Sequence, residues 1–127
     1  IAKLALKEGL TVLNEDKIII RKEKGLFKIY GTPWNGKNQK TINNFSYINE
    51  IFFLKKSKTN QIEPIGKTKA VIEFVKNSFY LSVNNSMIKK RFDVCFDLAE
   101  NLNCYCFGFR PDKSIWRFLN GFLKQSS

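Results

Sequence analysis

The loop at residues 30–38, which reads YGTPWNGKN, is the stretch of this chain with the most unusual choice of residues. Gly31 and Gly36 free the backbone, Pro33 restricts it, and the bulky indole of Trp34 stands between them. A surface turn needs only Gly, Pro, Asn or Asp, so the tryptophan requires a reason. Two interpretations stay open: a hairpin end whose tryptophan covers a small satellite core, which the local sequence favours, and a loop shaped for a ligand.

The residue types that the chain lacks narrow its chemistry. It contains no histidine, which excludes Ser-His, Cys-His and His-metal mechanisms within these 127 residues. Its cysteines, Cys95, Cys104 and Cys106, are odd in number and do not have the C-x-x-C spacing of a zinc site. We interpret them as buried, reduced thiols of a cytoplasmic protein.

Charge and composition set the class of protein. Because 43% of the residues are hydrophobic, the chain can build one core. Its formal net charge is +11. The basic residues extend from Lys3 to Lys124 and cluster only at residues 55–58, which is typical of a solvated surface. No apolar run reaches the roughly 20 residues that cross a bilayer. The sequence therefore predicts a single domain over residues 1–127 without a membrane as its partner, and it disfavours nucleic acid.

The elements that would position the loop follow from periodicity and turn residues. Ile1, Leu4 and Ala5 form one stripe, which predicts a helix over residues 1–8. Because this helix has no capping residue and no initiator Met, we expect further residues upstream of it. The other elements expected in the first half are strands at 11–14 and 17–22 separated by Glu15-Asp16, a turn at Lys24-Gly25, a strand at 26–30 and an aperiodic polar loop at 37–44.

Strands and helices alternate in the second half, which predicts an α/β fold. The apolar run INEIFFL at 48–54 is typical of an interior strand covered on both faces. Thr68 is expected to cap one helix, and Asn84 or Asn85 a longer one. The remaining expected elements are a short extended segment at 60–65, a strand at 103–109 and a final helix opened by Pro111-Asp112.

Several segments in this order resemble the nucleotide-binding domain of HPr serine kinase-like proteins, which share a fold with phosphoenolpyruvate carboxykinases. These segments are LNEDKIIIR, the short hairpin after it, IYGTPWNGK, INEIFFLKKSKTNQIEPI and CYCFGFRPDKSIW. The resemblance covers nearly the whole chain and implies a mixed sheet with flanking helices. Members of the family carry a Gly-rich phosphate-binding loop ending in Gly-Lys-Ser or Gly-Lys-Thr and followed by a helix. Residues 1–8 would be that helix, and the loop itself is not in this chain.

The resemblance also implies site residues. Glu15 and Asp16 fall at the acidic pair of the family, which is implied to hold Mg²⁺ and to take the proton from an attacking hydroxyl. The pair is Glu-Asp here rather than Asp-Asp, so Asp16 is favoured for the acid–base role; from local sequence alone, the same pair is a polar turn between strands. The family pattern places the GTPWNG loop near the phosphate site. There we infer that Gly31 and Gly36 permit close backbone approach, that Thr32 offers a hydroxyl and that Lys37 offers a charge. Trp34 would form a wall of the pocket or pack beneath it.

The implied function is part of an ATP-dependent phosphotransferase, a serine kinase-like protein that acts on a hydroxyl of a protein, peptide or small molecule. Its cofactors would be ATP and Mg²⁺, and its partners a nucleotide and a small protein or peptide acceptor. We expect the chain to be inactive without the upstream loop. The alternative is a non-catalytic basic module for an acidic protein partner or nucleic acid. Aromatic platforms interleaved with basic residues would favour nucleic acid, but most aromatic residues here have core-like spacing.

Overall fold

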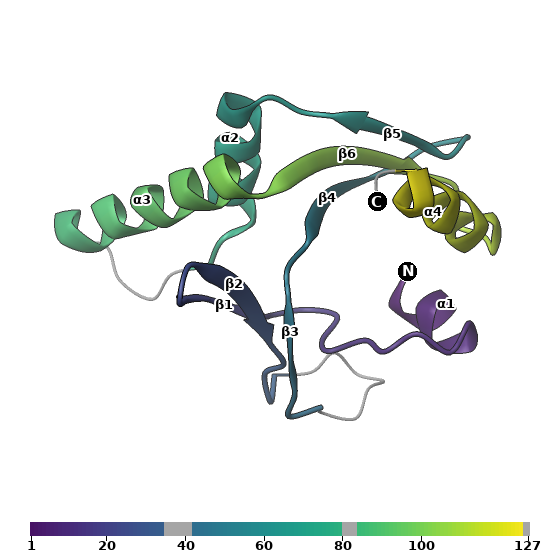
Figure 1. Cartoon of the computed structure of the whole chain (residues 1–127), viewed down its shortest axis with the longest axis horizontal. Coiled ribbons are helices and arrows are strands. Elements are labelled where there is room, and N and C mark those ends of the chain that lie inside the picture. Colours follow the sequence, from purple (N-terminus) through teal and green to yellow (C-terminus); the bar gives the residue numbers. More distant parts are fainter. Residues whose placement is uncertain (35–41, 80–83, 126–127) are drawn as a thin grey trace. The chain divides into compact units, whose positions relative to one another are not determined.

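The computed structural model describes residues 1–34, 42–79 and 84–125 and contains two three-stranded sheets with flanking helices (Figure 1). The chain divides into two compact units. The first unit comprises Ile1–Ile48, Lys56–Asn60 and Phe109–Ser127, and the second comprises Asn49–Lys55 and Gln61–Gly108. The mixed α/β class predicted from the sequence is confirmed, whereas the single sheet that was expected is replaced by two small ones.

The sheet of the first unit is antiparallel and has the strand order β1–β2–β3. Strand β1 (Ile19–Glu23) and strand β2 (Leu26–Tyr30) form a hairpin. Its turn holds Lys24 and Gly25 at φ values of 51° and 80°, as a two-residue type I′ turn requires. The predicted turn and the strand at 26–30 are therefore confirmed. Strand β3 (Phe45–Tyr47), which the sequence analysis missed, pairs with β2.

The strand predicted at residues 11–14 is wrong. Residues 10–18 have no regular secondary structure, because the side chain of Asn14 accepts the backbone N–H groups of Asp16 and Lys17 and so turns the chain locally. The predicted first helix is confirmed as α1 (Ala2–Lys7). The last helix, α4 (Ser114–Gln125), begins after the predicted Pro111-Asp112, and Asp112 Oδ1 accepts the backbone N–H of Ser114.

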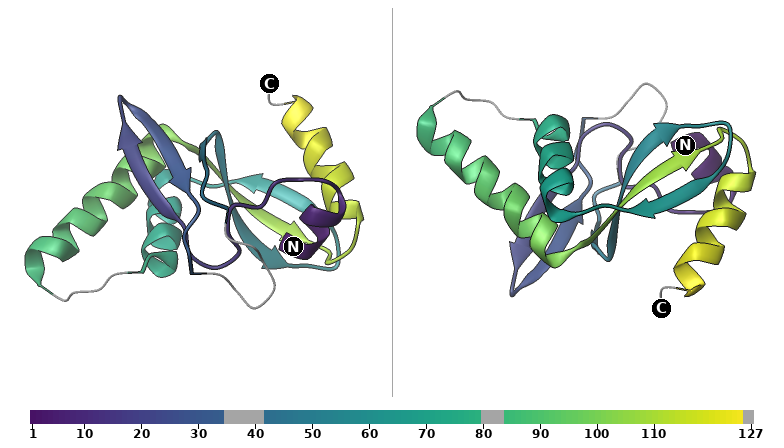
Figure 2. Two further views of the ribbon diagram at one scale, coloured as in Figure 1. Left: turned by 90° about the horizontal axis from the view of Figure 1, so that it is seen from below. Right: turned by 90° about the horizontal axis from the view of Figure 1, so that it is seen from above.

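The sheet of the second unit has the order β4–β6–β5, with β6 (Asn103–Phe109) in the centre. Strand β5 (Gln61–Pro64) is antiparallel to β6, whereas the arrows of β4 (Glu50–Lys56) and β6 point the same way (Figure 2), so this sheet is mixed. The prediction of an interior strand at 48–54 is wrong, because β4 lies at the edge and β6 takes the central place.

Two helices, α2 (Lys67–Asn77) and α3 (Asn85–Asn101), complete the second unit. Asn84 caps α3 by accepting the N–H of Met87, which confirms one predicted cap; the other is wrong, because α2 begins after Gly66 and has no side-chain cap. Phe74 of α2 packs edge-on against Phe53 of β4, with ring centroids 5.1 Å apart. The buried apolar residues of this unit are Ala70, Val71, Phe74, Cys95, Leu98, Ala99, Cys104 and Phe107.

Arg91 of α3 also secures the end of α2. Its guanidinium donates to the carbonyl of Val75, and its Nε donates to Ser78 Oγ at 2.7 Å. These carbonyl and hydroxyl groups lie at the C-terminal end of α2, where backbone acceptors lack helical partners and a cation is favourable. The arginine therefore connects the two helices through polar contacts.

The cysteines belong to the core of the second unit. Cys95 and Cys104 are buried, and burial raises the pKa of both thiols above the ordinary value. The predicted burial is confirmed for these two residues, while Cys106 is half-buried. Within the ranges that the structure describes, no helix combines the length and the apolar character needed to cross a membrane.

Candidate functional site

Asn14 joins the two parts of the site expected from the sequence. Its Nδ2 donates to the backbone oxygen of Thr32 at 3.1 Å and to that of Trp34 at 3.0 Å. Its Oδ1 accepts the N–H of Asp16 at 2.7 Å and that of Lys17 at 3.0 Å. The amide nitrogen of one side chain thus donates to the Gly31–Trp34 segment while its oxygen accepts from the acidic turn, so the two segments lie side by side.

Thr32 is the most completely buried polar residue of this arrangement, with 1% of its surface exposed. Its Oγ1 donates to the backbone oxygen of Lys17 at 2.7 Å and accepts from Asn14 Nδ2 at 3.1 Å. The hydroxyl that we expected to face a phosphate is therefore used inside the protein, where it ties the loop to the start of β1. A contact between Thr32 and phosphate would require these bonds to be exchanged.

Gly31 does permit the close backbone approach that was inferred, but the backbone that approaches is the chain's own. A Cβ at this position would lie 2.3 Å from the carbonyl oxygen of Ile42 and 3.2 Å from that of Leu13. The N–H of Gly31 also donates to the carbonyl of Asn44 at 3.1 Å. The glycine is thus enclosed by two other segments of main chain, at Leu13 and at residues 42–44.

Trp34 is 61% exposed, so it does not cover a satellite core, and the interpretation that the local sequence favoured is not supported. Its backbone oxygen is held by Asn14, which fixes the main chain beneath an indole that faces solvent. Gly36 and Lys37, the other expected loop contributors, lie outside the described residues. An exposed indole on an anchored backbone suits a ligand contact better than a packing role.

Glu15 and Asp16 are both exposed. In the part of the chain that the structure describes, no group of three or more His, Cys, Asp or Glu side chains could hold a metal ion. Two neighbouring carboxylates nevertheless match the donors of Mg²⁺, which takes one or two carboxylates and completes its shell with water and substrate phosphates. The acidic turn therefore fits Mg²⁺ carried with a nucleotide and does not fit a metal held by protein side chains alone.

The sequence analysis missed the role of Asn14, although a signal was present. An asparagine side chain commonly bonds the main chain two residues onward, so Asn-Glu-Asp predicts a turn in which the asparagine is the structural member. The local sequence does not predict the other bonds of Asn14, which go to the carbonyls of Thr32 and Trp34, 18 and 20 positions further along the chain.

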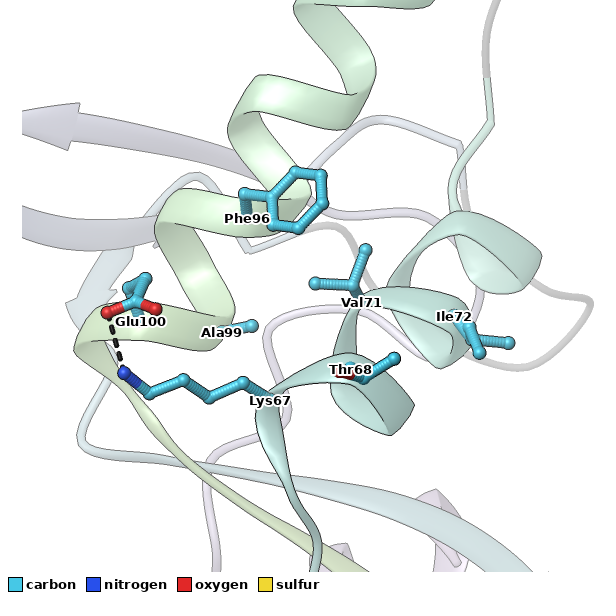
Figure 3. Close-up of a pocket in the computed structure, with 7 residues that line it drawn as sticks. All are labelled: Lys67, Thr68, Val71, Ile72, Phe96, Ala99 and Glu100. Carbon is cyan, nitrogen blue, oxygen red and sulfur yellow. Dashed lines mark hydrogen bonds and ion pairs between the residues drawn. The ribbon is translucent and has the colours of Figure 1, made fainter.

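The second unit contains a groove between α2 and α3 that the sequence analysis did not predict. It has a volume of about 480 Å³, and at one end Lys67 Nζ and Glu100 Oε2 form an ion pair at 2.7 Å (Figure 3). Phe96 reaches from α3 toward Val71 of α2 in the same view. Among the described residues its lining is mainly apolar, and the two charged side chains there, Lys67 and Glu100, pair with each other.

No protein-family model, curated protein or solved structure matches this chain. The resemblance to HPr serine kinase-like proteins therefore stays a prediction from the sequence motifs.

Proposed function

We propose that this chain is part of an ATP-dependent phosphotransferase of the serine kinase-like type, in which the Glu15-Asp16 turn serves the metal and the phosphoryl acceptor. The observation that carries the proposal is the Asn14 side chain, which holds the acidic turn against the segment that ends in Trp34. Motifs about 20 residues apart in the sequence, for which the family resemblance implies one site, are thereby neighbours in space.

The chemistry asked of these residues is modest. Phosphoryl transfer depends mainly on positioning and charge neutralisation, and the carboxylates of Glu15 and Asp16 would hold the Mg²⁺ that neutralises the phosphates when it is bound. Asp16 would in addition accept the proton of the attacking hydroxyl at a carboxylate oxygen. The bond from its backbone N–H to Asn14 Oδ1 fixes the main chain that carries this carboxylate.

The loop contributes shape to the proposed site. Trp34 would form a wall against the base or the acceptor, since its ring is exposed while its carbonyl is anchored. Gly36 and Lys37 follow Trp34 two and three residues later in the sequence and keep their expected roles beside the phosphates. The upstream Gly-rich loop implied by the family resemblance would supply the main grip on ATP.

Paramagnetic broadening tests the proposed metal position without requiring turnover. Mn²⁺ substitutes for Mg²⁺ and broadens amide resonances near its binding site in NMR spectra of the ¹⁵N-labelled chain. We expect broadening centred on residues 14–17, because Glu15 and Asp16 offer the carboxylate oxygens that such a cation takes. Asp16→Asn should remove this broadening.

The matched control is Asp93→Asn, which removes an exposed carboxylate from α3 and should leave the broadening at the acidic turn unchanged. If Mn²⁺ broadens α3 as strongly as the turn, or if Asp16→Asn leaves the pattern intact, the turn is not a metal site and the proposal fails.

A further inference from the structure

The β1–β2–β3 sheet has one face that is aromatic and solvent-exposed. Side chains alternate between the faces of a strand, so strand pairing decides which of them lie together. Tyr30 pairs with Phe45 and Lys28 with Tyr47, which puts these four on one face; Arg21, opposite Lys28, joins them from β1. The buried Phe27 is on the other face, which is therefore the core side.

Three aromatic rings adjoin one another on this face. The ring centroids of Tyr30 and Phe45 are 5.8 Å apart, and those of Phe45 and Tyr47 are 6.3 Å apart. Phe45 is 47% exposed and Tyr47 is 51% exposed, so much of their surface is in contact with water. The argument from core-like spacing, which disfavoured nucleic acid at the level of sequence, therefore does not hold for these residues.

Two basic side chains, Lys28 and Arg21, lie over these rings. Lys28 Nζ lies 4.9 Å from the centroid of Phe45 and 5.4 Å from that of Tyr47, and Arg21 Cζ lies 5.7 Å from that of Tyr30. Lys28 also forms an ion pair with Glu23 at 2.7 Å, so it orients the two rings and is already neutralised. The exposed Arg21 is the cation of this face that can meet an anionic partner directly.

The hairpin of this sheet is basic. From Ile19 to Tyr30 it has four basic residues and one acidic residue, Glu23, which gives a net charge of +3, and β3 adds no charged residue. The partner that complements this sheet is therefore a polyanion, and the exposed rings require it to offer flat, apolar surfaces as well.

We propose that this face binds single-stranded nucleic acid, with bases stacked on Phe45 and Tyr47 and the phosphate backbone beside Arg21. Single strands combine the polyanion with unpaired bases, whereas a duplex hides the base faces inside its stack. The inference is independent of the phosphotransferase proposal, because it uses different residues and requires neither ATP nor metal.

Fluorescence anisotropy with a labelled 12-nucleotide single-stranded DNA of mixed sequence tests the proposal. We expect saturable binding that weakens steeply between 50 and 200 mM salt. Phe45→Ala and Tyr47→Ala should each weaken binding by roughly 5- to 100-fold, the scale of one lost stacking contact. Phe45→Trp and Tyr47→Trp keep a flat ring and should retain the wild-type affinity.

Two control variants separate this face from the general charge and apolar surface of the chain. Phe92→Ala removes a ring on α3 that is 41% exposed, close to the value for Phe45, and should not change binding. Arg117→Gln changes the charge of α4 as much as Arg21→Gln changes that of the sheet, and only Arg21→Gln should weaken binding several-fold. Circular dichroism of every variant confirms that it is folded.

Other outcomes would overturn the proposal. Equal affinity for the same sequence as a duplex, with no effect of Phe45→Ala or Tyr47→Ala, would mean that the charge alone attracts polyanions. Failure to bind the single strand, together with binding to polyglutamate or to vesicles containing phosphatidylserine, would assign the face to an acidic protein or to a lipid surface instead.

Discussion

Gly31→Ala is the substitution for which the structure predicts the clearest loss of stability. The added Cβ would lie 2.3 Å from the carbonyl oxygen of Ile42, whereas real Cβ atoms essentially never come within 3.0 Å of another heavy atom, so the main chain has to move by at least 0.7 Å. Crowding of this kind costs about 1–3 kcal/mol. Loss of the Gly31–Asn44 hydrogen bond increases this cost by about 1 kcal/mol. The alanine chain has less conformational entropy when unfolded, which offsets about 0.4–1 kcal/mol of the cost. We therefore expect the free energy of unfolding to fall by about 1–3.5 kcal/mol.

Urea unfolding followed by tryptophan fluorescence measures this loss, because Trp34 and Trp116 both belong to the unit that contains Gly31. A loss of that size lowers the midpoint by about 1 M urea for a typical dependence on denaturant. The control is Gly121→Ala in α4, where an added Cβ meets nothing within 4 Å. Removing a glycine from a helix interior should raise stability by about 0.5–1 kcal/mol. Equal midpoints for the two variants would refute the packing described at Gly31.

Further predictions concern acid stability, helix packing and turnover. The hydrogen bond from Lys28, followed by that from Tyr30, holds the pKa of the Glu23 carboxyl below its ordinary value, so the stability it contributes is present above that value and is lost as the pH falls through the folded pKa. Glu23→Gln should therefore lower the melting temperature at pH 7, and this decrease should become smaller as the pH drops below about 4.5. An equal decrease in melting temperature at pH 7 and at the lower pH would contradict this. Arg91→Met should lower the free energy of unfolding by about 2 kcal/mol in urea titrations, because charged hydrogen bonds to the end of α2 are lost; an unchanged midpoint would show that these bonds add nothing. In a longer chain that carries the upstream loop, Asp16→Asn should reduce phosphotransfer by about 10²-fold or more at unchanged circular dichroism, and wild-type turnover would exclude the carboxylate role.

The sequence by itself determined most of the local structure, because local structure depends on side chains that are near in the chain. Alternating apolar residues identified the strands at 26–30 and 103–109, the Lys24-Gly25 pair identified the hairpin turn, and Asn84 was recognised as a cap. The acidic turn at Glu15-Asp16 and the loop at residues 30–38 were also found as candidate site segments from their residue types. Their chemical roles remain predictions.

Tertiary structure alone decided which of these parts meet and which faces remain open. An apolar strand such as INEIFFL can be central or at an edge, and only pairing with β6 put β4 at the edge. Asn14 could have capped any turn, but its bonds to Thr32 and Trp34 depend on how the loop returns to it. Phe45 and Tyr47 have the spacing of core residues and are nevertheless exposed, because hydrophobic periodicity shows which side chains share a face but not whether another layer covers that face.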